Sequence, residues 1–86
     1  MCFVYIIESQ TTFSWYYGFT ERKPDERLTE HNGNHRHYTA KRGPWVLIFL
    51  REFEEKRDAL AFEKKLKSLR NKTFIRKEYS SYFIGR

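Results

Sequence analysis

The chain has 86 residues, of which 40% are hydrophobic and 19% aromatic. This predicts one folded domain over residues 1–86 and excludes a disordered chain or two separate cores. Its single cysteine excludes an internal disulfide and a zinc site built on a cysteine cluster, and it is typical of a reducing compartment. We find no signal-like leader and no apolar run of membrane-spanning length, so we expect a cytoplasmic protein with no membrane partner.

The net charge of +6 is distributed unevenly. Residues 1–40 hold four Lys/Arg and five Asp/Glu, a balance of −1, whereas residues 41–86 hold thirteen and six, a balance of +7. A basic half beside a near-neutral half is typical of a surface that binds a polyanion. Lysines solvated on ordinary helices give the same pattern, so charge alone does not decide between the two interpretations.

The first predicted elements are two strands. The apolar runs 2–7 and 13–19 are rich in β-branched and aromatic residues, and the polar segment between them suits a hairpin. Alternate side chains share a face, so Tyr16 lies with Gly18, and a register that sets Tyr5 opposite or diagonal to Tyr16 makes both hydroxyls emerge together. Gly18 would then leave a gap for a ligand backbone. For the hairpin alone, aromatics buried in a core are the simpler interpretation.

A short helix is expected over about residues 24–32. Pro24 suits the first helical turn, acidic residues follow it, and Gly33 suits the end. Arg27 and His31 are four residues apart and therefore share one face, which joins a fixed cation to a titratable imidazole. Taken alone, this pair is an ordinary exposed pair on a surface helix.

Residues 33–45 predict a loop, because two Gly-containing dipeptides interrupt regular structure. Cations beside aromatic rings suit phosphates and unpaired bases. The candidate nucleic-acid-binding residues in the loop are Arg36, Tyr38, Lys41 and Arg42. His35 and His37 have no third ligand at suitable spacing, so we reject a structural metal site there.

The rest of the chain predicts one strand and two helices. Residues 46–53 form an apolar run, which predicts a strand buried on both faces and therefore central in its sheet. Residues 55–68 have helical periodicity with Glu63 at the edge of the apolar stripe, where a solvent-facing, salt-bridging glutamate is the simpler interpretation. Residues 71–78 predict a short last helix, and the aromatic tail 79–83 is expected to pack on the core. The apolar stripe consists of Ala59, Phe62, Leu66 and Leu69.

The sequence therefore predicts an α/β (α+β sandwich) domain: a three-stranded antiparallel β-sheet flanked by helices, in the order β-β-α-β-α-α.

The motifs described above, taken in chain order, resemble those of the GIY-YIG nuclease superfamily and of its small single-domain branch. Phe3-Val4-Tyr5 and Tyr16-Tyr17-Gly18 stand where that family has its two name motifs. Arg27 and His31 resemble its arginine and its histidine-or-tyrosine partner, and Glu63 stands at its metal-binding glutamate. Residues 38–45 are similar to its connecting segment. Each motif is short and unspecific, but the ordered set covers nearly the whole chain with matching spacing.

The chain also departs from the family pattern. Phe3 replaces the usual glycine and Tyr17 the usual isoleucine, which is acceptable if both side chains face the core. The stretch between Gly18 and Arg27 is one residue longer than usual. The family has an asparagine after the helix that carries the glutamate. Asn71 is the one candidate for it, and it stands closer to Glu63 in the sequence than the family pattern requires.

The resemblance implies Mg²⁺-dependent (or Mn²⁺-dependent) endonuclease hydrolysis of DNA phosphodiester bonds. Glu63 would hold the metal, and Tyr5, Tyr16, Arg27 and His31 would be catalytic. Arg27 would pair with phosphate oxygens, one tyrosine would accept a proton from water, and His31 would orient a tyrosine or relay its proton.

Two other functions stay open at this stage. One is a binding module on the same fold without cleavage, and the other is a small RNA-binding protein, suggested by the basic half and the aromatic loop. With no separate targeting domain in the sequence, we expect branched or damaged DNA as the partner, linked to DNA repair, rather than a specific sequence.

Overall fold

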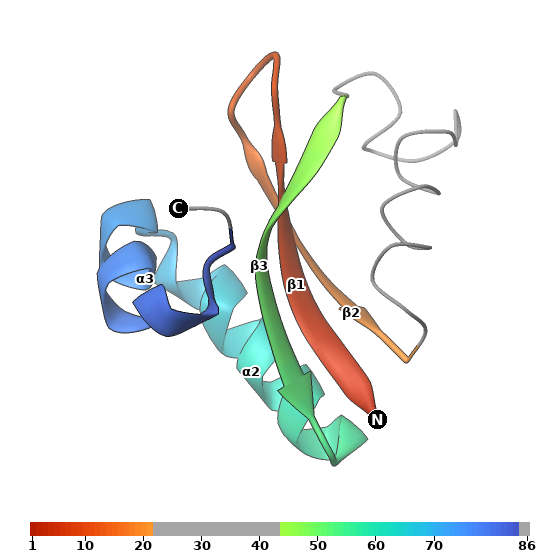
Figure 1. The fold of residues 1–86 in the computed structure, drawn as a ribbon. Helices are drawn as coiled ribbons and strands as arrows, with labels where there is room; N and C mark the ends of the chain where they lie inside the picture. Colours follow the sequence, from red (N-terminus) through yellow and green to blue (C-terminus); the bar gives the residue numbers. More distant parts are fainter. Residues whose placement is uncertain (22–43, 85–86) are drawn as a thin grey trace.

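The computed structural model describes residues 1–21 and 44–84, and their arrangement is shown in Figure 1. The described elements are β1 (Cys2–Ser9), β2 (Trp15–Thr20), β3 (Trp45–Phe53), α2 (Lys56–Leu69), α3 (Lys72–Glu78) and the 3₁₀ helix η2 (Ser80–Tyr82). The expected α+β class and the order of these elements are confirmed. The predicted helix over 24–32 lies outside the described residues, as does most of the predicted loop 33–45; Trp45, assigned to that loop, instead begins β3.

The β1–β2 connection spans residues 10–14, two residues later than the sequence indicated. Ser9 Oγ accepts hydrogen bonds from the backbone N–H groups of Thr11 (3.2 Å) and Thr12 (3.0 Å), which closes the turn. Phe13 has a positive φ of 61°, a conformation that costs a non-glycine residue energy. The tip is tied to the helices, because Lys72 Nζ donates a 2.7 Å hydrogen bond to the Phe13 carbonyl.

The sheet is antiparallel with the order β2-β1-β3, so the prediction that residues 46–53 form the central strand is wrong. β1 is central and β3 lies at an edge. The predicted burial on both faces is met only in part: Trp45 and Phe49 are buried, Val46 and Glu52 are exposed, and the other residues of β3 are half-buried. On the helix side, Arg51 packs over three aromatic rings. Its guanidinium carbon lies 4.7 to 4.8 Å from the ring centroids of Phe53, Phe62 and Tyr82.

The register divides the sheet into two faces with separate clusters. We call the side that α2 covers the helix face and the other side the tyrosine face. The helix-face cluster includes Val4, Ile6, Phe49, Phe62 and Leu66. The tyrosine-face cluster consists of Tyr5, Ile7 and Trp45, with Tyr16, Leu47 and Leu50 packed against it.

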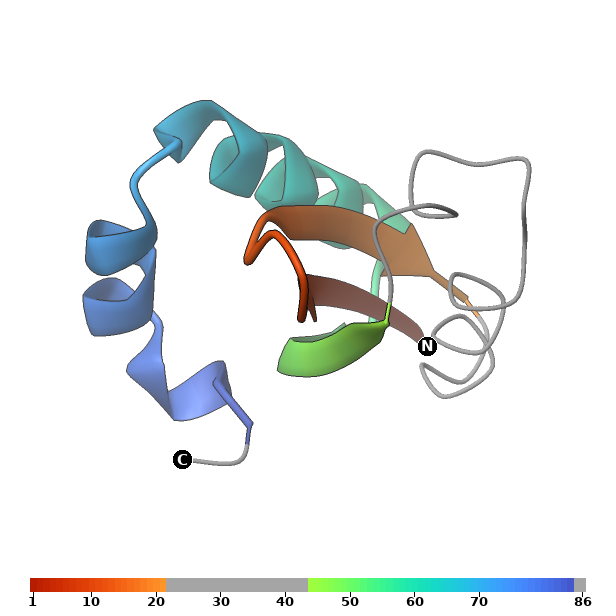
Figure 2. The same ribbon diagram turned by 90° about the horizontal axis from the view of Figure 1, so that it is seen from above.

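The two helices lie on the helix face (Figure 2). In α2, the predicted stripe is confirmed: Ala59, Phe62 and Leu66 are buried, and Leu69 is partly buried against them. The Asn71 side chain caps α3 by accepting a 2.9 Å hydrogen bond from the Phe74 N–H. Within residues 1–21 and 44–84, no helix has the length and apolar character needed to cross a membrane.

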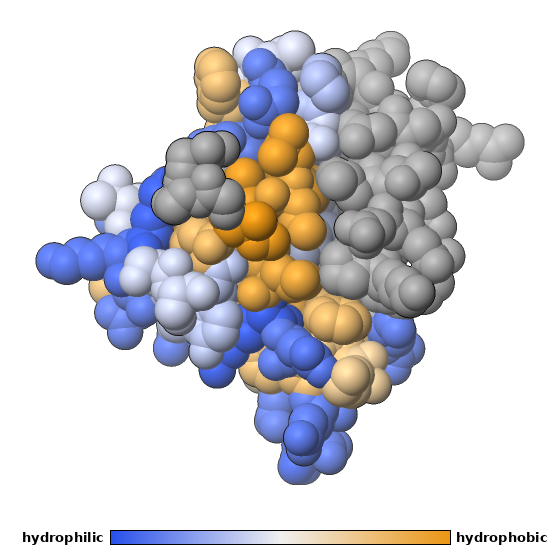
Figure 3. Space-filling model, in the orientation of Figure 1, coloured by the Kyte–Doolittle hydropathy of each residue, from blue (hydrophilic) through white to orange (hydrophobic). Residues whose placement is uncertain are grey.

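The aromatic tail packs on the core as expected. Phe83 forms an isolated antiparallel bridge with Phe49, and the Ile84 N–H donates a 2.8 Å hydrogen bond to the Ile48 carbonyl. These contacts cover part of the free β3 edge. An apolar patch lies over β3 in the middle of the surface in Figure 3, with hydrophilic surface beside it.

Candidate functional site

Tyr5 and Tyr16 lie on the same face of the hairpin, because the register is one of those that the sequence analysis left open. Tyr5 pairs with Gly18 and Ile7 pairs with Tyr16, so the two tyrosines are diagonal neighbours on the tyrosine face. Residues in this relation are within reach of each other through long side chains. The structure therefore brings the two name-motif tyrosines together.

The gap expected above Gly18 is not there, because Tyr5 fills it. A Cβ built on Gly18 would collide with Cζ and Oη of Tyr5 and lie 2.6 Å from its Cε1. The Tyr5 ring thus crosses the sheet above the glycine, and the residue is only 1% exposed. Glycine is required here for contact within the protein rather than for a ligand backbone.

Tyr16 is the more accessible of the two tyrosines. It is half buried, and its ring packs edge-on against Trp45 at 6.5 Å between centroids. Trp45 is itself buried in the tyrosine-face cluster. Packing against this rigid neighbour limits the orientations of the Tyr16 ring and leaves part of the residue open to a substrate.

Glu63 comes from the middle of α2, at the edge of its apolar stripe, as expected. Its side chain is 16% exposed, and Oε2 forms an ion pair of 3.1 Å with Lys67 Nζ. An ion pair with this i,i+4 spacing on a helix contributes about 0.3–0.5 kcal/mol. The salt-bridging interpretation is thus correct as far as it goes, and it does not exclude a second role.

The two parts of the predicted site lie on opposite faces of the sheet. Glu63 is on the flank of α2 that carries Lys56, whose Nζ lies 6.0 Å from the ring centroid of Phe19 in β2. Phe62, on the other flank, contacts Phe49 and Phe53 of β3. Because β2 is an edge strand, a site that uses Glu63 and the tyrosines together extends around the β2 edge.

The remaining predicted site residues lie outside the described part of the chain. They are Arg27, His31, Arg36, Tyr38, Lys41 and Arg42. Their roles stay predictions.

A single carboxylate fits the expected metal. Residues 1–21 and 44–84 contain no group of three or more His, Cys, Asp and Glu side chains that could hold an ion. Mg²⁺ commonly takes one or two carboxylates and completes its octahedron with waters and substrate phosphate. The partly exposed Glu63 carboxylate is a ligand of this kind, and its Oε2 also contacts Lys67 Nζ.

Sequence reasoning missed two features of the helix face. Tyr17 packs against the helix-face cluster, and burial raises the pKa of its phenol. Trp15 donates a hydrogen bond from Nε1 to Glu8 Oε2 at 3.1 Å, and the guanidinium carbon of Arg76 lies 5.2 Å from its ring centroid. The Glu8–Trp15 pair follows from the hairpin register, but the contact with Arg76 joins residues 61 positions apart.

Comparison with known proteins gives two matches. The model of the GIY-YIG catalytic domain matches residues 1–79. The solution NMR structure of the UPF0213 protein BH0048 from Bacillus halodurans is 32% identical, with a TM-score of 0.54, over 94% of this chain and 84% of that one. No curated protein matches this chain.

Proposed function

This chain belongs to the GIY-YIG catalytic domain family, whose fold is of the nuclease type, and from that premise we propose that it hydrolyses DNA phosphodiester bonds as a metal-dependent endonuclease. The observation that carries the proposal is the diagonal placement of Tyr5 and Tyr16 on one face of a hairpin within the matched residues. Branched or damaged DNA is the proposed substrate class, with a role in DNA repair.

Hydrolysis requires a base for the attacking water, and the tyrosines are the proposed source. A free phenol titrates near pH ~10, so it acts as a base only beside a cation that stabilises the phenolate. Tyr16, which is half buried, can meet a water at the substrate, whereas Tyr5 is enclosed above Gly18. We therefore assign the proton-accepting role to Tyr16 and a positioning role to Tyr5.

Two residues of the predicted helix 24–32 complete the proposed mechanism. Arg27 pairs with phosphate oxygens through its planar guanidinium, and it is the cation that favours a phenolate nearby. His31 orients Tyr16 or takes on its proton.

Glu63 is the proposed ligand of Mg²⁺ or Mn²⁺. When bound, such an ion supplies positive charge to the phosphate and to the leaving 3′ oxygen. Lys67 holds the Glu63 carboxylate in place through their ion pair and becomes available to a phosphate once that pair is released. One protein ligand implies weak metal binding without substrate.

A binding module without cleavage is the second candidate, and one observation favours it. Asn71, the candidate for the family's asparagine, uses its side-chain oxygen to cap α3. The side-chain oxygen of Asn71 therefore has a structural role in the cap of α3, which weakens its match to the family's asparagine. RNA in place of DNA is the third candidate.

A cleavage assay tests the proposal. Branched, flapped, damaged and plain duplex DNA are incubated with and without Mg²⁺ or Mn²⁺, and RNA is added as a competitor. Cleavage of DNA that requires the metal and resists RNA competition supports the endonuclease. Binding without cleavage supports the module, and preferential competition by RNA supports the third candidate.

A further inference from the structure

A pocket of about 300 Å³ lies on the helix face beside α3, on the opposite side of the sheet from Tyr5 and Tyr16. Its polar lining comes from Glu8, Gln10 and Arg76. Phe83, Val46 and two isoleucines supply the apolar lining. A concave site of this size, with a few convergent polar groups among apolar ones, is typical of ligand binding.

Trp15 fixes both charged groups of this pocket. Its indole N–H holds the Glu8 carboxylate, and its ring face packs against the Arg76 guanidinium. Phe83 lies 5.1 Å from the same guanidinium carbon, so two rings flank Arg76. Because both groups are held before any ligand arrives, binding costs little side-chain entropy.

The charges of the lining select the chemistry of the ligand. Glu8 and Arg76 balance each other, which disfavours a phosphate, since the carboxylate repels it. A hydrogen-bond acceptor and a donor fork that line one pocket instead suit a neutral group with both donors and acceptors on one edge. The Phe83 ring and the aliphatic side chains suit a flat face on that group.

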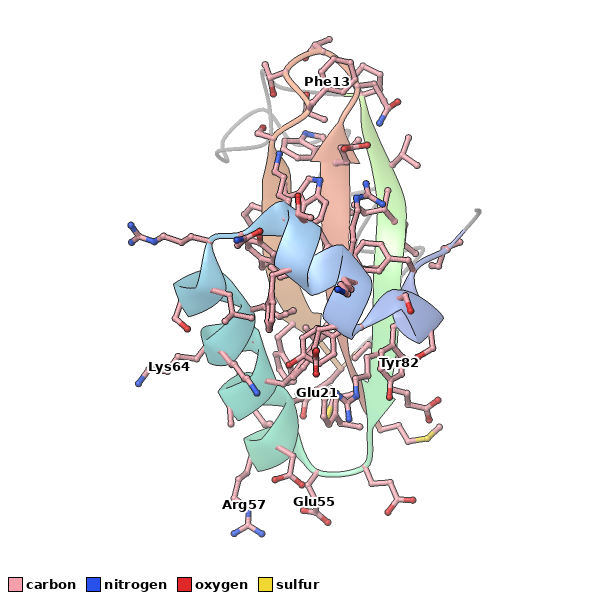
Figure 4. The ribbon with its side chains drawn as sticks, turned by 90° about the vertical axis from the view of Figure 1, so that its left-hand side faces the viewer. Phe13, Glu21, Glu55, Arg57, Lys64 and Tyr82 are labelled. Carbon is pink, nitrogen blue, oxygen red and sulfur yellow. The ribbon has the colours of Figure 1, made fainter. Side chains whose placement is uncertain are left out.

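The surroundings of the pocket suit a polyanionic backbone. Lys72 lies beside it, with Nζ 5.2 Å from the Trp15 ring centroid. The segment 70–78, which contains α3, holds four Lys/Arg and one Asp/Glu, a balance of +3. Phe13, 61% exposed at the hairpin tip in Figure 4, adds an aromatic surface held in place by Lys72.

We propose that the Glu8–Arg76 pocket binds one unpaired nucleobase of the DNA, with the flanking phosphates on the cations of α3. This inference rests on the proposed function, because it assumes that the chain handles nucleic acid. It makes the protein selective for DNA that offers an extrahelical base, and it places that selection on the face opposite the tyrosines.

The test is binding in EDTA, so that no metal-dependent cleavage interferes. Fluorescence anisotropy compares a perfect duplex with the same duplex carrying one bulged 2-aminopurine. Val46→Trp fills the pocket from an exposed position (44%) on a strand, and Leu60→Trp is the matched control at an exposed position (41%) on α2. We expect wild type and Leu60→Trp to prefer the bulged duplex by about fivefold or more, with 2-aminopurine fluorescence quenched by stacking, and Val46→Trp to lose both effects.

A second variant covers the case in which Val46→Trp does not fold. Glu8→Gln keeps the shape and an acceptor for Trp15, and by charge alone it would tighten binding to both duplexes. We expect it to reduce the preference for the bulge. Equal affinity of wild type for both duplexes, a preference that survives Val46→Trp, or equal tightening by Glu8→Gln would each overturn the inference while leaving the endonuclease proposal standing. Failure of wild type to bind either duplex would remove the proposed function itself.

Discussion

The phenol ring of Tyr5 occupies the space that a Cβ on Gly18 would fill, and this contact joins the two name motifs of the family within one hairpin. Tyr5 is almost fully buried, so its ring cannot move aside freely. Because Gly18 has no side chain, the Tyr5 ring can lie directly above it, and this contact fixes the position of Tyr5. Gly18 and Tyr5 therefore act as one unit.

Gly18→Ala should lower the free energy of unfolding by about 1–3 kcal/mol, because the added methyl overpacks against the Tyr5 ring. Urea unfolding of the single variants and of Gly18→Ala in a Tyr5→Leu background measures the coupling. Leucine ends short of the clash, so the alanine should cost less in that background. An equal cost in both backgrounds would mean that Tyr5 does not press on Gly18.

Tyr5→Phe and Tyr16→Phe should each slow cleavage and leave the fold intact, since each removes one hydroxyl and keeps the ring. If Tyr5 acts through Tyr16, the double variant should be little slower than the slower single variant. Single-turnover rates on one DNA substrate, with circular dichroism of each variant, check this. Tyr17→Phe, on the helix face, is the matched control and should cleave at the wild-type rate. If the factors by which Tyr5→Phe and Tyr16→Phe slow cleavage multiply in the double variant, the two tyrosines have independent roles.

Tyr17 should weaken the protein at high pH. Burial raises its folded-state pKa above the ordinary value of 10.0, so the unfolded chain loses this proton first as the pH rises. The contribution is fully present below pH 10 and is lost as the pH increases through the folded pKa. Urea unfolding from pH 8 to 11.5 should show a steeper loss of stability in wild type than in Tyr17→Phe. Parallel pH profiles would contradict the assignment.

Affinity for DNA should fall steeply with salt, because contacts between cations and phosphates release condensed counterions. Neutralising Lys41 and Arg42 together to Gln should weaken binding and flatten the salt slope by about one unit per lost contact. Arg57 and Lys64, which point away from the sheet in Figure 4, provide the matched control pair. An unchanged slope in the Lys41/Arg42 variant would remove that loop from the binding surface.

Local patterns were enough to predict much of this fold. The hairpin followed from two β-branched and aromatic runs, and the buried side of α2 followed from the spacing of Ala59, Phe62 and Leu66. Alternation along the strands placed Tyr16 with Gly18 on one face, and only the register then placed Tyr5 on that face as well. Each of these depends on neighbours within one or two elements.

The errors came from contacts that only the assembled chain provides. Strand order was wrong because an apolar run does not show whether both edges of a strand are paired, and the aromatic tail covers part of the β3 edge. The gap above Gly18 was wrong because the direction of the Tyr5 ring depends on the register. The pocket beside α3 depends on Arg76 meeting Trp15, a contact with no local sequence pattern.

The central claim, metal-dependent cleavage through Glu63, is tested most directly by one comparison of Glu63→Gln with Glu78→Gln. Both remove one carboxylate from a helix, and Glu78 is exposed at the end of α3. Loss of the Glu63–Lys67 ion pair should cost about 0.5 kcal/mol or less, so both variants should fold. Cleavage with Mg²⁺, DNA affinity and melting temperature are measured on the same preparations. We expect Glu63→Gln to lose cleavage and to bind DNA as well as wild type or slightly better, with Glu78→Gln fully active; wild-type cleavage that survives EDTA, together with full activity of Glu63→Gln, would contradict it.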